Sequence, residues 1–219
     1  MSKKKLIGSL ILNTFTVLSV IVCIIILLMK NNNTFRMFTT QSNVISGVVG
    51  LIIVIFEILI VLKKRNELPK WVKLVKMVTT TGVTLTFIVV VFYLGFVAVA
   101  QGHNYFDLFK NTNLFFHFLT PVSAILSFIL FEGTDEINFK LTFLNVIHMV
   151  AYSIFYTINV FTHLSSDGKV QRKYDWYYFV NGENWTFGII AIVLLLVTYG
   201  IGLLLWWSNK KIYNKHLFE

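Results

Sequence analysis

Residues 6–29 read LIGSLILNTFTVLSVIVCIIILLM, a run of apolar and small side chains without a single charged residue. A helix needs about 20 such residues to cross about 30 Å of hydrocarbon. The run is also longer than the apolar part of a cleaved signal peptide, which is about 7–15 residues. We therefore predict that it forms a retained transmembrane helix.

Similar runs recur along the rest of the chain. They cover roughly residues 38–62, 72–99, 114–131, 141–162 and 185–207. The chain of 219 residues is 56% hydrophobic and 13% charged, whereas soluble domains are roughly 45–50% apolar and about 25% charged. The sequence therefore predicts an all-α, polytopic membrane protein in which residues 1–219 form a single domain of six transmembrane helices.

Basic side chains predict the orientation, because Lys and Arg gather in cytoplasmic loops. With the N-terminus inside, 13 of the 19 Lys and Arg residues fall in inner segments and 6 in outer ones. Trp71, Trp206 and Trp207 then lie at inner boundaries and Trp185 at an outer one, as in an aromatic belt. Both termini are expected in the cytoplasm.

Composition also limits the partners and cofactors. The same flanking bases explain the net charge of +9, and no basic stripe interleaved with aromatics indicates nucleic-acid binding. The single cysteine, Cys23, excludes an intrachain disulfide, and the five histidines are scattered, so we expect no metal and no cofactor. Frequent Lys, Asn, Ile and Phe are typical of an AT-rich bacterium, which favours the bacterial plasma membrane. The sequence predicts no particular oligomeric state.

Polar side chains inside a membrane helix are costly unless they face the bundle interior. Helix two carries such residues on one stripe, at spacings of four, three, four and seven: Thr39, Asn43, Ser46, Gly50 and Glu57. Thr40 lies about 100° away from Thr39. Thr39 and Asn43 are equally explained as caps of the free N–H groups of the helix. Glu57 is near the inner end, where we expect it to reach water or to pair with a base.

Helices four and five carry polar stripes of their own. Helix four has His117, Thr120, Ala124 and Ser127 on one face, and helix five has Asn145, His148, Tyr152, Tyr156 and Asn159. Pro121 predicts a bend and an unpaired carbonyl at His117, four residues earlier. His148 is expected at inner-leaflet depth, far from His117. The stripes indicate either a hydrated or ligand-filled cavity or an interhelical hydrogen-bond network.

Thr39 and His117 are expected at the same depth, because helices two and four both run from outside to inside. An imidazole within hydrogen-bond reach of a hydroxyl can act as its general base. The alternative is that His117 is a hydrogen-bonded packing residue. The aromatic segment 174–179 (YDWYYF) lies in the longer outer loop and is either an interfacial belt or a lid over a site that opens outward.

Four motifs carry a family resemblance. FTTQSN (38–43) opens helix two, NLFFH (113–117) and ILFE (129–132) flank Pro121 in helix four, and DWYYF (175–179) precedes helix six. This set resembles the androgen-induced-protein family, which includes the androgen-dependent TFPI-regulating protein. The resemblance extends over nearly the whole chain by helix count and order, although each motif is short.

The resemblance implies an intramembrane threonine hydrolase that cleaves lipid (fatty-acyl) esters, such as fatty acid esters of hydroxy fatty acids. The general base then falls on His117. The nucleophile falls on Thr39 if the Phe-Thr pair is matched and on Thr40 if Asn43 is matched, and the stripe favours Thr39. The His-to-Pro spacing is one residue shorter here than in the animal members, which alters the expected local geometry. Oxyanion donors are Asn43, Ser42 or the free N–H groups that open helix two.

The stripes also predict which residues contact the lipid or lipid-ester substrate: Asn43, Ser46, Thr120, His148, Tyr152 and Tyr156. The same residues suit a small transporter or lipid-binding protein without catalysis, although no inverted repeat or broken helix pair supports transport. A non-catalytic scaffold is the third alternative, and it does not explain the stripes.

Overall fold

The computed structural model describes residues 2–30, 34–180 and 184–213, without the side chains of 184–186. Every regular element within these ranges is helical. Six segments are long and apolar enough to cross a bilayer: Lys3–Met29, Phe38–Val61, Lys70–Ala100, Thr112–Phe131, Phe139–Thr162 and Phe187–Tyr213. The prediction of an all-α membrane protein with six spans is confirmed.

The first, second and sixth spans are single helices, and the other three are composite. The single ones are α1 (Lys3–Met29), α2 (Phe38–Val61) and α8 (Asn184–Tyr213). The third span joins α3 (Lys70–Ile88), the π-helix η1 (Val89–Leu94) and α4 (Gly95–Ala100). The fourth joins α5 (Thr112–Leu114), the π-helix η3 (Phe115–Leu119) and α6 (Thr120–Phe131). The fifth joins the 3₁₀-helix η4 (Phe139–Val146) and α7 (Ile147–Thr162), and a second 3₁₀-helix, η2 (Tyr105–Phe109), lies in the loop before the fourth span.

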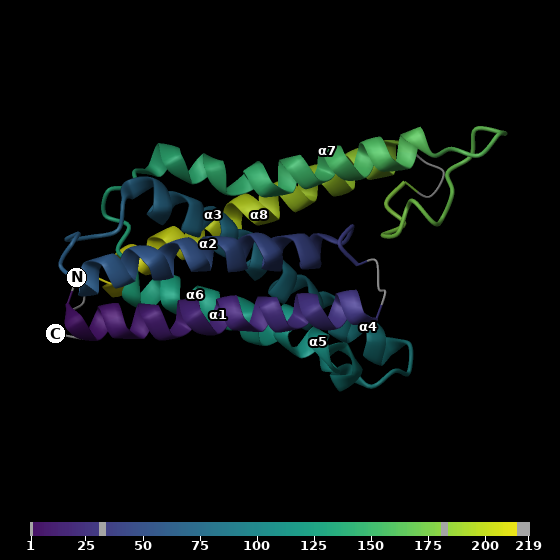
Figure 1. Cartoon of the computed structure of the whole chain (residues 1–219). Coiled ribbons are helices and arrows are strands. Elements are labelled where there is room, and N and C mark those ends of the chain that lie inside the picture. Colours follow the sequence, from purple (N-terminus) through teal and green to yellow (C-terminus); the bar gives the residue numbers. More distant parts are fainter. Residues whose placement is uncertain (1, 31–33, 181–183, 214–219) are drawn as a thin grey trace.

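The beginning of α1 and the end of α8 lie at the same end of the bundle (Figure 1). Lys5 Nζ donates to the carbonyl of Tyr213 at 2.7 Å. We call this the terminal end and the opposite one the loop end. Which end faces the cytoplasm stays a prediction from the charge count, and Lys215 and the Trp185 side chain lie outside the described residues.

The surface of α1 shows why the bundle belongs in lipid. Ile11 and Leu18 are 62% and 57% exposed, whereas Ser9, Asn13 and Thr16 are fully buried. A helix of a soluble protein buries its apolar face instead. The inversion is what a hydrocarbon solvent requires, because polar groups there need protein partners.

The centre of the bundle is α3, which contacts α2, α6, α7 and α8. All its residues from 79 to 86 (TTTGVTLT) are buried. Small side chains allow this enclosure, because neighbouring helices can approach closely. A Cβ on Gly82 would lie 2.7 Å from Nδ1 of His148 in α7, so the third and fifth spans need a glycine at this crossing.

Candidate functional site

The polar stripes of helices two and four face the interior, as predicted. On α2, Asn43 and Glu57 are fully buried and Ser46 is 1% exposed. On α6, the corresponding residues Thr120, Ala124 and Ser127 are all fully buried. Thr39 and His117, at the loop-end extremes of the two stripes, are half-buried.

Asn43 fastens the beginning of α2 to the fourth span. Its Nδ2 donates to the carbonyl of Thr39 at 2.8 Å and to the carbonyl of Phe116 at 3.0 Å. The two carbonyl oxygens are therefore no more than 5.8 Å apart, the sum of those distances. Helices two and four are thus neighbours at the depth of Thr39 and His117.

His117 lies in the π-helical turn η3, just before Pro121. The N–H of Thr120 donates to the carbonyl of Phe115, five residues earlier. The irregularity predicted from Pro121 therefore takes the form of a widened turn that leads into α6. Single π-turns inside α-helices are frequent at functional sites.

The His117 ring is oriented by a backbone carbonyl from η2. Its Nδ1 is 3.0 Å from the carbonyl oxygen of Leu108. Because a carbonyl only accepts, Nδ1 must carry the hydrogen, and in the neutral ring Nε2 then holds the lone pair. A general base needs this tautomer, because the lone pair of Nε2 is not used in the bond to Leu108.

Thr39 and His117 both lie at this junction between α2 and the fourth span. Among the described residues, no hydrogen bond joins them. Thr39 is half-buried whereas Thr40 is 3% exposed, so of the two threonines Thr39 is more accessible to a substrate. The assignment of the pair to catalysis stays a prediction.

Two of the predicted oxyanion donors are already engaged. Both hydrogens of the Asn43 amide are donated, to Thr39 and Phe116. The Ser42 hydroxyl lies 3.1 Å from the carbonyl of Thr39 and 3.2 Å from Oγ1 of Thr86. Neither side chain is available to a substrate without giving up one of these bonds.

The backbone N–H groups of Thr39 and Thr40 are the remaining donors. The N–H of Gln41 donates to the carbonyl of the residue that caps α2, which is the first backbone hydrogen bond of this helix. The N–H of Phe38 donates to the Tyr177 hydroxyl at 3.1 Å. Within the described ranges, the N–H groups between them have no acceptor. They lie at the positive end of the α2 dipole, where an anion is stabilised.

His148 lies nearer the loop end than predicted. Its ring stacks on Phe38, the first residue of α2, with centroids 4.8 Å apart. The inner-leaflet prediction is therefore wrong. The fifth span begins as the 3₁₀-helix η4, which rises about 2.0 Å per residue rather than 1.5 Å, and this moves His148 away from the terminal end. Both ring nitrogens are buried and lack a partner among the described residues.

The tyrosines of α7 bind the loop between the fifth and sixth spans. The Tyr152 hydroxyl donates to the carbonyl of Arg36 at 2.9 Å and accepts from Nε1 of Trp176 at 3.1 Å. The Tyr156 hydroxyl donates to the Asp175 carboxylate. These two hydroxyls, predicted to contact substrate, are engaged with the segments that cover α7 and the beginning of α2.

The segment 174–179 is fastened at several points. Asp175 also accepts from the N–H groups of Phe179 at 3.0 Å and Val180 at 3.3 Å. Tyr177 is bonded to the beginning of α2, and burial raises the pKa of its phenol above the usual value. The segment therefore packs on α7 and α2, and both predicted roles, an interfacial belt and a lid, stay predictions.

Replacing Asp175 by alanine is expected to speed tryptic cleavage after Arg172 and Lys173 roughly tenfold or more. The change removes hydrogen bonds to a charged acceptor, each worth about 1.5–3 kcal/mol. Without them the segment unfolds locally more often, and trypsin cleaves the locally unfolded form. Asp167→Ala is the matched control, because the partners of this exposed carboxylate among the described residues are Lys169 and Ser165 in the same loop. Equal cleavage rates in the two variants would contradict the anchoring role.

No family model, no curated protein and no solved structure matches this chain. The resemblance carried by FTTQSN, NLFFH and DWYYF therefore stays a prediction.

The sequence did not predict a second polar centre, in the terminal half of the bundle. There Lys76 of α3 and Glu132, which follows α6, form an ion pair of 3.5 Å with side chains 1% and 2% exposed. Lys76 was counted among the basic residues of the inner segments. Without Lys76, the inner segments still hold more Lys and Arg than the outer ones, so the predicted orientation is unchanged. The burial of this side chain could have been suspected from its position, because Lys76 lies one helical turn before the small-residue stretch 79–86.

Proposed function

We propose that the protein is an intramembrane hydrolase of lipid esters, with Thr39 as nucleophile and His117 as general base. The observation that carries the proposal is the bond from His117 Nδ1 to the Leu108 carbonyl at 3.0 Å. It leaves Nε2 as a proton acceptor, on the residue that directly follows Phe116, whose carbonyl binds Asn43 of α2. An imidazole held in one tautomer by a second group is the arrangement of an activated nucleophile.

The reaction proceeds in two halves. Nε2 of His117 takes the hydroxyl proton as Thr39 Oγ1 attacks the ester carbonyl, and the N–H groups of Thr39 and Thr40 donate to the oxyanion. The alkoxide leaves with the proton from the imidazolium, and an acyl-threonine remains. Water then attacks this ester, gives its proton to His117, and the collapse releases the fatty acid while Oγ1 regains the proton.

The step requires the Thr39 hydroxyl to turn toward His117. Hydrogen bonds between catalytic groups are often long or absent before substrate binds and tighten in the complex. The first turn of α2 allows this, because Thr39 is half-buried there and its hydroxyl makes no other hydrogen bond among the described residues.

The substrate class follows from where the pair lies. Both residues belong to membrane spans, so a substrate must arrive from within the leaflet with its ester near the headgroups. Acyl chains suit the aliphatic and aromatic surface that the bundle exposes. Fatty acid esters of hydroxy fatty acids are the substrates that the resemblance implies, and the predicted location is a bacterial plasma membrane.

The test is covalent labelling of the purified protein by a fluorophosphonate probe. We expect labelling of the wild type, its loss in Thr39→Ala, and its retention in Thr40→Ala, the matched control one residue away. Labelling that persists in Thr39→Ala would refute the assignment of the nucleophile.

A binding or transport role is the second function, and one observation favours it. The hydroxyls of Ser46, Thr80 and Thr120 are buried without a partner among the described residues. Buried hydroxyls normally find a partner, so these three suit a polar ligand or water between the helices. Lipid binding that survives Thr39→Ala, with no turnover in the wild type, would favour this role.

A further inference from the structure

The polar centre of the terminal half is built around one basic side chain. Lys76 Nζ donates to Oδ1 of Asn13 at 2.6 Å and pairs with Oε1 of Glu132 at 3.5 Å. The same Oε1 accepts from Asn13 Nδ2 at 2.9 Å, from Ser9 at 3.3 Å and from Ser127 at 2.8 Å. One oxygen of Glu132 is thus fully engaged. The other, Oε2, is buried without a partner among the described residues.

A second carboxyl group faces this cluster from α2. Glu57 is fully buried, so of its two predicted roles, reaching water or pairing with a base, the first is wrong. Glu57 lies on the side of α2 that packs against α1, in the neighbourhood of Ser9 and Asn13, with Lys76 and Glu132 as the nearby charged groups. Neither of its oxygens makes a hydrogen bond of normal geometry within the described part of the chain.

The charges of this cluster do not balance. Two carboxylates and one ammonium leave one uncompensated negative charge in the interior of a membrane protein, where it is strongly disfavoured. Three carboxylate oxygens, both of Glu57 and Oε2 of Glu132, also need a hydrogen-bond donor. A single proton removes the excess charge and supplies a donor at once.

We propose that Glu57 holds an exchangeable proton, which it presents to the unpartnered oxygens of the cluster. The ligand set favours a proton over a metal ion. The described residues bring no third acidic, histidine or cysteine side chain to the two carboxylates, and the Lys76 ammonium repels a metal ion at this position.

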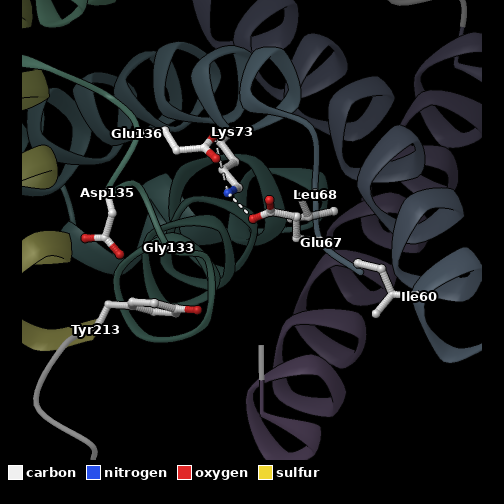
Figure 2. A pocket seen from close by; sticks show the side chains of 8 residues that line it. All are labelled: Ile60, Glu67, Leu68, Lys73, Gly133, Asp135, Glu136 and Tyr213. Atoms are coloured by element: carbon white, nitrogen blue, oxygen red, sulfur yellow. Dashed lines mark hydrogen bonds and ion pairs between the residues drawn. The ribbon is translucent and has the colours of Figure 1, made fainter. Parts of the chain in front are cut away.

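A pocket at the terminal end lies on the route that we infer for the proton between Glu57 and solution. It has a volume of about 200 Å³ and is lined by Ile60, Glu67, Leu68, Lys73, Gly133, Asp135, Glu136 and Tyr213 (Figure 2). Its lining residues are sequence neighbours of the cluster. Ile60 and Lys73 lie one helical turn from Glu57 and Lys76, toward the terminal end, and Gly133 directly follows Glu132.

The pocket is polar enough to hold water. Lys73 Nζ lies 3.2 Å from Glu67 and 3.6 Å from Glu136, as Figure 2 shows for the first of these pairs. Both carboxylate side chains are exposed, at 64% and 42%. The proton on Glu57 therefore exchanges through the terminal end, for which the charge count predicts a cytoplasmic location. This site lies in the opposite half of the bundle from Thr39 and does not depend on ester hydrolysis.

The test is infrared spectroscopy of the protein in lipid. We expect the C=O stretching band of a protonated carboxylic acid in the wild type, a shift of that band after transfer to D₂O, and its loss in Glu57→Gln. Glu67→Gln, which removes a carboxyl group from the pocket, is the matched control and keeps the band. Glu57→Asp retains a carboxyl group and shifts the band instead of abolishing it.

The opposite results overturn the proposal. These are a wild type without an acid band, a band that persists in Glu57→Gln, or a band that does not respond to D₂O. A carboxylate signal of Glu57 that responds to added Na⁺ would also overturn it, because the site would then hold a metal ion. Gln is neutral and isosteric with a protonated Glu, so Glu57→Gln should fold, and a monodisperse elution profile with the helical circular dichroism of the wild type is the check.

Discussion

Replacing Lys76 by methionine is expected to lower the free energy of unfolding by about 3–5 kcal/mol, the usual effect of removing one partner of a buried ion pair. Methionine keeps most of the volume of the lysine side chain but removes the charge that faces Glu132 and Glu57. It also leaves Oδ1 of Asn13 without its 2.6 Å donor. The measurement is a reversible unfolding titration with a denaturing detergent in mixed micelles.

Lys73→Met is the control for this experiment, because Lys73 lies one turn earlier on the same helix. Its partners Glu67 and Glu136 are exposed, and such pairs contribute about 0–1 kcal/mol. Adding Glu132→Gln to Lys76→Met should restore much of the lost stability, since no unpaired charge then remains on Glu132. If Lys73→Met and Lys76→Met destabilise equally, the buried cluster does not stabilise the fold.

The burial of Lys76 could not be predicted from the sequence. Its spacing from Lys70 and Lys73 is that of a basic flank, and the spans around it could be predicted from apolar runs alone. What buries Lys76 is the convergence of three helices that bring Asn13, Glu57 and Glu132 to it. Such contacts join residues about 20–60 positions apart, and no local pattern records which helices are neighbours.

The loop-end site around Thr39 and His117 was predicted only in part, because some of its contacts also join segments that are distant in the sequence. Helical periodicity predicted that Thr39 and Asn43 share an inward stripe and that Thr39 and His117 lie at one depth, and the contact of Asn43 with Phe116 agrees. The bond from His117 to Leu108 comes from a loop whose path the sequence does not indicate. The depth of His148 was wrong because it assumed an α-helical rise where the chain forms a 3₁₀-helix.

The two polar centres are linked by a single helix. Thr39 and Glu57 are five turns apart on the same stripe of α2, which is roughly 27 Å along the axis at 1.5 Å per residue. Each lies close to one end of the span, so the two centres lie toward different sides of the membrane. Between them, Ser46 and Gly50 keep the stripe small and buried. The stripe that suggested one site therefore contributes to two.

Replacing His117 by alanine is expected to lower kcat/KM for lipid-ester hydrolysis by about 10²–10⁴, the usual contribution of a general base. Most of the loss should appear in kcat, because the imidazole acts on the Thr39 proton rather than on acyl-chain binding. Free imidazole should restore part of the rate by entering the space left beside Leu108. The measurement is steady-state hydrolysis of a fatty-acyl ester in mixed micelles.

His103→Ala is the matched control, because His103 is an exposed histidine in the loop that leads to η2. Its rate should equal that of the wild type. The rescue by imidazole separates catalysis from packing, since a histidine that only supports the π-turn η3 would lose activity through misfolding and would not respond to a free base. A His117→Ala variant that hydrolyses the ester at the wild-type rate would leave Thr39 without a base and remove the chemical argument for the enzyme.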